Sequence, residues 1–247
     1  MAVGLRYRRI FLEASGWFFL VNRLSWLLFP KIAPNLIRKL SSEDRIRFHT
    51  YITSICHAIF VSIGGFLCAY ELVGCTNHHA YFGHSMLAVN VSEVFISYLL
   101  QDLGILIYHY NILRDKESII HHVIFLTISQ YAVSKSYFVW PFTWLILGET
   151  STPFVGIRWL LAVSGNKESK LYFYNGVLLL GTFFLFRGIL YGHGLYDMFK
   201  NYSIWGDVAA LNMVAFGLTL AYGLNLIWLT RIIAGVRRSL MKKAKPQ

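Results

Sequence analysis

Five polar side chains within apolar stretches are the candidates for chemistry in this sequence. Asp102 lies inside one apolar run, His121 and His122 open the next, and Glu149 and Arg187 interrupt two later runs. A carboxylate beside an imidazole can orient the ring and tune its basicity, which suits proton transfer. A charge at the centre of a membrane helix costs on the order of 3 kcal/mol. We therefore predict that Asp102, His121 and His122 are catalytic, with His122 the first choice as general base.

The helix around Asp102 carries one broad polar face. Tyr98 and Asp102 are four residues apart and share one stripe, and Gln101 falls on the neighbouring stripe about 100° away. Lipid tails offer no hydrogen bonds, so this face should look into a helix bundle. Tyr98, Gln101, Glu149 and Arg187 are therefore predicted to line a polar cavity or substrate-binding site.

The two histidines are poorly spaced for a metal. Neighbouring residues on a helix diverge by about 100°, whereas a chelating pair stands four apart. We therefore expect no metal site and no bound cofactor. An arginine inside an apolar run needs a counter-charge, and Glu149 or Asp102 is the expected partner of Arg187.

The composition indicates an integral membrane protein. Of 247 residues 56% are hydrophobic and only 14% are charged, against about 25% charged in soluble domains, and the mean hydropathy is +0.50. The net charge of +11 gathers at the ends of apolar segments, so we expect no nucleic-acid partner. The three cysteines indicate no disulfide framework.

The predicted fold is all-α, a polytopic membrane bundle of about seven helices. The first segment, Phe11–Pro30, either spans the membrane or lies in its interface, because it is short and carries charge. Six clearer spans follow, namely Phe48–Val73, Met86–Tyr110, Ile119–Trp140, Phe142–Val163, Leu171–Leu195 and Val208–Ile233. We predict an N-terminal segment with a basic connector over 1–45, a membrane domain over 46–235 and a basic tail over 236–247.

Charge patterning predicts the topology, and a proline predicts a break. Lys and Arg are concentrated in alternate loops and in the C-terminal tail, which the positive-inside rule places in the cytosol. Pro153 lacks an N–H and clashes with the carbonyl of Glu149, so the predicted span Phe142–Val163 should bend there.

The order of these residues resembles the TLC domain. The pattern is an Asp in one apolar helix, His-His opening the next, and then E-x-S/T-x-P-F-x-x-x-R-W, formed here by Asp102, His121, His122, Glu149, Ser151, Pro153, Phe154, Arg158 and Trp159. The closest branch is the TLC-domain-containing protein 4 type. The resemblance implies a bundle or barrel of six helices, with one more ahead of it in several members, and a role in lipid homeostasis.

Ceramide synthases share this domain and transfer acyl chains from acyl-CoA to a sphingoid base. They carry a further His-Asp-x-x-Asp cluster, which this sequence lacks; Glu149 stands roughly where it would be. That departure argues against ceramide synthesis.

Three functions remain open from the sequence. The first is a lipid-binding or regulatory protein acting in sphingolipid or phospholipid homeostasis, with membrane lipids and other membrane proteins as partners. The second is an acyltransferase with acyl-CoA as co-substrate, and the third is a transporter. Lys243 and Lys245 resemble a dibasic retrieval signal, so we expect a multi-pass protein of the endoplasmic reticulum membrane with a cytosolic C-terminus.

Overall fold

The computed structural model describes residues 2–135, 139–205 and 209–243, and these contain helices and no strand. The helices are α1 (Ala2–Ile32), α2 (Pro34–Lys39), α3 (Ser42–Glu71), α4 (Asn77–Phe82), α5 (Met86–Tyr108), α6 (Tyr110–Leu113), α7 (Lys116–Lys135), α8 (Val139–Leu147), η1 (Gly148–Ser151), α9 (Thr152–Val163), α10 (Lys170–Thr182), η2 (Phe183–Leu190), α11 (Tyr191–Lys200), α12 (Tyr202–Trp205) and α13 (Ala209–Lys243). The all-α prediction is confirmed.

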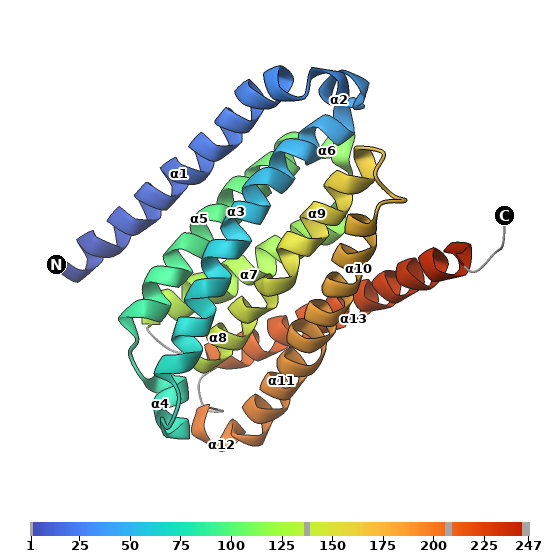
Figure 1. The fold of residues 1–247 in the computed structure, drawn as a ribbon. Helices are drawn as coiled ribbons and strands as arrows, with labels where there is room; N and C mark the ends of the chain where they lie inside the picture. The colour runs from blue at the N-terminus through green and yellow to red at the C-terminus, as the bar shows by residue number, and fades with distance from the viewer. Residues whose placement is uncertain (1, 136–138, 206–208, 244–247) are drawn as a thin grey trace.

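The long helices run side by side as a bundle (Figure 1). α1 lies along α5 and α3 on one side, and α7 packs against the opposite side of α5. α3 also packs against α8 and α9, while α13 crosses α10 and η2 on the far side of the bundle. The largest group of buried apolar side chains fills the space between these helices, with Trp144 and Ile146 of α8 fully buried.

Serine caps begin three of the long helices. The hydroxyls of Ser41, Ser85 and Ser169 accept hydrogen bonds from backbone N–H groups in the first turns of α3, α5 and α10. Such caps satisfy donors that have no partner inside the helix. These caps set the first residue of each helix. The Ser85 cap therefore also sets how far Asp102 lies from the start of α5.

Several of the helices can cross a membrane. Four stretches of the described chain are long and apolar enough, namely Ser42–Glu71, Met86–Tyr108, Lys170–Lys200 and Asn212–Arg238. The protein is therefore a multi-pass membrane protein, and the count of seven spans stays a prediction. α1 lies along two of these helices, as a spanning segment would.

The predicted boundary between the fourth and fifth spans was misplaced. Trp140 belongs to α8, which begins at Val139, and not to the end of α7. Residues 136–138 between these two helices lie outside the described residues, as do residues 206–208 and the last four residues of the basic tail.

Two segments depart from α-helical geometry, and both reach the interior. η1 is a 3₁₀ segment that directly precedes α9, where Pro153 occupies the first turn. η2 is a π-helical segment inside one continuous helix from Lys170 to Lys200. The two contact each other. Wide π turns often mark functional positions, because they re-aim side chains that a regular helix would point elsewhere.

Candidate functional site

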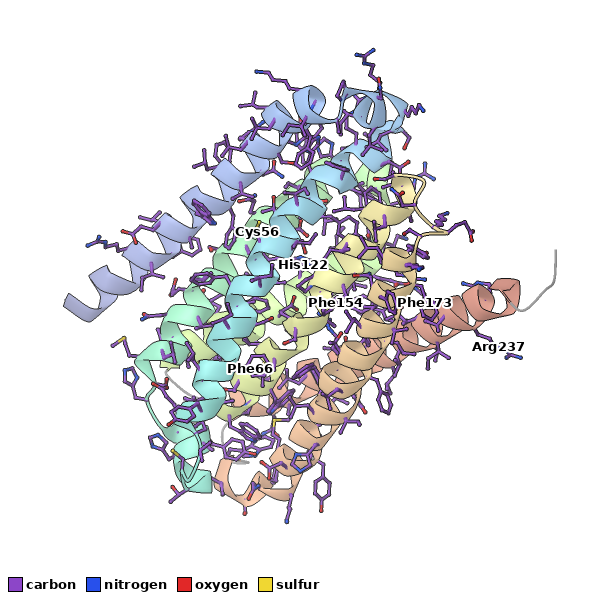
Figure 2. The ribbon with its side chains drawn as sticks, viewed as in Figure 1. Cys56, Phe66, His122, Phe154, Phe173 and Arg237 are labelled. Atoms are coloured by element: carbon purple, nitrogen blue, oxygen red, sulfur yellow. The ribbon has the colours of Figure 1, made fainter. Side chains whose placement is uncertain are left out.

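A cavity of about 420 Å³ opens inside the bundle, and residues of α3, α5, α7, η1, α9, α10, η2 and α13 line it. Its lining contains six of the seven residues predicted from sequence, namely Tyr98, Asp102, His121, His122, Glu149 and Arg187. They come from four different elements, so only the folded chain brings them together. His122 lies within the bundle in Figure 2, with the α9 residue Phe154 close to it in that view.

Gln101 is the predicted residue that lies elsewhere. Its side-chain amide donates to the carbonyl oxygen of Phe18 on α1, at 3.1 Å. It does not line the cavity. The polar face of α5 is wide enough to contact two neighbouring helices. Gln101 hydrogen-bonds to α1, and Asp102 faces α7.

Asp102 and His122 meet across the cavity wall. His122 Nε2 lies 3.0 Å from Asp102 Oδ2, but the ring N–H is not aimed at that oxygen well enough for a hydrogen bond. His122 Nδ1 lies 2.7 Å from the carbonyl oxygen of Ser118. A carbonyl oxygen only accepts, so Nδ1 carries a proton. Nε2 then faces the Asp102 carboxylate at ion-pair distance without a hydrogen bond, so both ring nitrogens of His122 lie against an oxygen.

His121 has a different environment. Its ring packs against Phe125, with centroids 4.3 Å apart, and against Trp228 at 5.3 Å. Its Nδ1 is buried and has no hydrogen-bond partner in the described chain. The neighbouring histidines therefore divide into one ring held on both nitrogens and one ring with a free nitrogen.

Arg187 makes a buried ion pair with Glu149. Arg187 Nη2 lies 3.0 Å from Glu149 Oε1, and both side chains are about 10% exposed. The guanidinium also donates to the hydroxyls of Ser151 and Thr152 and to the side-chain oxygen of Asn225. Of the two counter-charges expected from sequence, Glu149 is the one used.

Pro153 explains why a backbone carbonyl is available to accept a hydrogen bond from Arg187. Because Pro153 has no N–H, the carbonyl of Glu149 is left to the N–H of Thr152, which gives the 3₁₀ turn. That shift releases the carbonyl of Gly148, and Arg187 Nε donates to it at 2.9 Å. The bend that the sequence predicted at Pro153 is therefore present as a 3₁₀ turn, and the carbonyl that it frees is that of Gly148.

Two more ion pairs lie at the edge of the cavity, near the start of α7. Arg231 of α13 contacts both carboxylate oxygens of Glu117 at 2.7 and 2.8 Å, and Trp228 also donates to Glu117. The hydrogen bond from Arg231 lowers the pKa of Glu117, which precedes the apolar part of α7. Arg47 of α3 pairs with Asp115 at 3.1 Å. These pairs join α13 and α3 to the start of α7.

Sequence reasoning missed the contribution of α3. Tyr51 and Ser54 line the cavity, and His57 stacks on Tyr98 with ring centroids 3.8 Å apart. Both ring nitrogens of His57 are buried without a partner in the described chain. The three residues are spaced three apart, which places them on one face of a helix. This polar stripe in the sequence could have indicated that α3 contributes to the cavity.

No group of three or more His, Cys, Asp or Glu side chains within the described ranges could hold a metal ion. The carboxylates of the cavity instead face arginines or the His122 ring, while Nδ1 of His121 has no partner among the described residues. The arrangement suits hydrogen bonding and proton exchange with a bound polar group.

Comparison with known proteins identifies the family. The family model described as the TLC domain matches residues 47–234. The chain belongs to the TLC domain family. Human TLC domain-containing protein 4 is 28% identical over 86% of this chain and 82% of its own length. TLC domain-containing protein 4-B of Xenopus laevis is 33% identical over 60% of this chain and 57% of its own length.

A zebrafish relative, TLC domain-containing protein 2, is 24% identical over 86% of each chain. The resemblance to the TLC-domain-containing protein 4 branch is thus confirmed. Every cavity residue named above lies within the matched TLC domain.

The buried ion pair should dominate the stability of the TLC domain. Removing one partner of such a pair typically costs about 3–5 kcal/mol, because the other charge stays buried without compensation. We expect Glu149→Gln and Arg187→Met each to lower the free energy of unfolding by that amount in detergent. The double variant should lose clearly less than the sum of the two, as seen by circular dichroism during denaturation. Additive losses would contradict the pairing.

Proposed function

We propose that this TLC domain protein binds one membrane lipid in its interior cavity and acts in sphingolipid or phospholipid homeostasis. The observation that carries the proposal is the cavity itself, where buried ionisable groups from four elements surround about 420 Å³ of space. That volume lies within the range of small-molecule sites, about 300–1,000 Å³. Apolar residues such as Leu99, Leu179 and Phe183 line the same space, which suits an amphiphile.

The charges of the lining indicate which head group fits. Its two arginines are already paired, Arg187 with Glu149 and Arg231 with Glu117. Asp102 and Asp115 also face the space, and no lysine lines it. A phosphate would therefore find no uncommitted arginine or lysine there. The lining suits a head group with hydroxyl, amide or amine groups, which can donate to the carboxylates.

The location follows from the sequence and stays part of the proposal. The basic tail, the dibasic pattern at Lys243 and Lys245, and the alternation of charged loops support an endoplasmic reticulum membrane protein with a cytosolic C-terminus. Other membrane proteins are then the natural partners. Transport has no comparable support, because the two irregular segments, η1 and η2, are direct neighbours and not matching breaks in two repeats.

Filling the cavity should displace its lipid. Ser54 lines the cavity, whereas Cys56, two residues along the same helix, is exposed on the outside of the bundle (Figure 2). We expect Ser54→Phe to lose most of a lipid that co-purifies with wild-type protein, as quantified by mass spectrometry of extracts. Cys56→Phe is the matched control and should keep it. Equal retention by both variants, each monodisperse in detergent, would contradict binding in this cavity.

A second candidate is acyl transfer, favoured by the contact of His122 with Asp102 and the free Nδ1 of His121 in one cavity. In such a reaction a lipid amine or hydroxyl attacks the carbonyl carbon of an acyl-CoA thioester. The new C–N or C–O bond forms as the C–S bond breaks. A histidine takes the proton of the nucleophile and returns it to the leaving thiolate. The geometry gives His121 the free nitrogen for this role and His122 the charge that stabilises the oxyanion.

A lipidome separates the two candidates. Cells lacking the protein would be rescued with wild type, His121→Ala or His122→Ala at matched protein abundance. If the protein is an acyltransferase, wild type restores one acyl-lipid class and both variants fail, with losses of about 100-fold or more for a lost general base. If the protein only binds lipid, the variants restore that class substantially. Failure that tracks lower abundance would remove the catalytic role.

A further inference from the structure

A second pocket, of about 430 Å³, lies where α9, α10 and α13 meet near their charged ends. Phe173, which lines it, is labelled in Figure 2 where α10 passes α13. Its lining residues have no member in common with those of the interior cavity. It is therefore a separate feature, and it contains a residue of the family pattern, Arg158, for which the proposed function gives no role.

Three cations from three elements converge on this pocket. Arg158 comes from α9, Lys167 from the loop after it and Arg238 from the last part of α13. Glu168 is the one acidic residue in the lining. None of the three cations forms a salt bridge with any residue in the described ranges. Like charges held close together repel, so an anion placed between them would relieve that repulsion.

Arg158 is held in place for such a role. Its Nη1 donates to the carbonyl oxygen of Tyr172 at 3.1 Å, and its guanidinium carbon lies 4.0 Å from the centre of the Tyr172 ring. Gly176 leaves room for it, since a Cβ there would collide with Nη1. The remaining guanidinium donors make no hydrogen bond to a described residue. A planar guanidinium with uncommitted donors matches the oxygens of a phosphate.

The surroundings indicate a lipid phosphate and not a soluble one. The pocket adjoins the start of α10, where the apolar span begins at Lys170. Leu171, Tyr174 and Val177 on that helix are each about half or more exposed. Exposed apolar side chains at this depth face acyl chains, and tyrosines gather at the level of the headgroups. An anion in the pocket would thus have its chains along the outer face of α10.

We propose that the pocket bounded by Arg158, Lys167 and Arg238 binds the phosphate headgroup of an anionic phospholipid at the membrane interface. The N-terminus of α10, which is the positive end of its helix dipole, also favours an anion there. Ser169 caps this first turn and lines the pocket. The proposal does not depend on the ligand of the interior cavity. It assigns two different lipids to the two sites, one neutral or amine-bearing and one anionic.

The test compares phosphatidylglycerol with phosphatidylcholine of the same chain length. The full-length protein in mixed micelles would be examined by native mass spectrometry. Wild type should retain one phosphatidylglycerol in preference to phosphatidylcholine. Lys167→Gln/Arg238→Gln removes two exposed cations and should weaken that preference by about 30-fold. Arg114→Gln/Lys116→Gln removes the same charge elsewhere and should leave it unchanged.

Three outcomes would overturn the proposal. Equal retention of phosphatidylglycerol by wild type and the pocket double variant would show that the pocket does not hold it. An equal loss in the control double variant would show a general effect of net charge. Displacement by glycerol 3-phosphate at the concentration of the lipid would show a site for soluble phosphates. Circular dichroism of each variant, unchanged from wild type, establishes that the fold is intact.

Discussion

The ion pair between Arg187 and Glu149 is almost fully buried in the helix bundle, and the surrounding backbone supplies a further hydrogen-bond acceptor to it. Pro153 forces a 3₁₀ turn that frees the carbonyl of Gly148 for the guanidinium. The π-helical segment presents Arg187 to that turn. Three chain segments are thereby tied together at one point, with Asn225 of α13 as a further acceptor. A buried pair is favourable only when its remaining donors find acceptors, and here each nitrogen of the guanidinium donates to at least one oxygen.

The pairing of arginines with carboxylates also determines the polar character of the cavity. With Arg187 and Arg231 committed to carboxylates, the space between the helices keeps acidic and imidazole groups as its polar contacts. The second pocket shows the reverse pattern, because none of its three cations forms a salt bridge with a residue that the structure describes. One membrane protein thus presents two polar environments of opposite preference, and each would select a different class of lipid headgroup.

Much of the interior site could be predicted because burying a polar group in a membrane is unfavourable in free energy unless the group has a partner. Asp102 and His122 lie on successive apolar helices and each needs a partner, which made them candidates for one site. The sequence did not show that they meet, and the structure brings them to 3.0 Å. The same reasoning left Glu149 and Asp102 as alternative partners of Arg187, and the structure selects Glu149. Gln101 could not be placed, since the sequence does not say which helix covers which stripe of α5. The structure puts α1 there.

The limits of the helices were harder to predict than their existence. The apolar runs of α7 and α8 read continuously in sequence, so Trp140 was assigned to the end of the first, whereas α8 begins at Val139. The stripe of Tyr51, Ser54 and His57 was missed because its polar groups are widely spaced in an apolar run. The π-helical segment has no sequence signature that period or composition would detect, because its side chains are apolar apart from Arg187.

The most direct measurement is photo-crosslinking from inside the cavity. A photoreactive amino acid at Val155, which lines the cavity, would be compared in cells with the same group at Leu178, which faces outward from α10. Adducts would be identified by mass spectrometry. A bound lipid predicts one dominant species without a phosphate monoester from position 155, and a mixture resembling bulk membrane lipid from position 178. The same mixture from both positions would contradict lipid binding in the cavity.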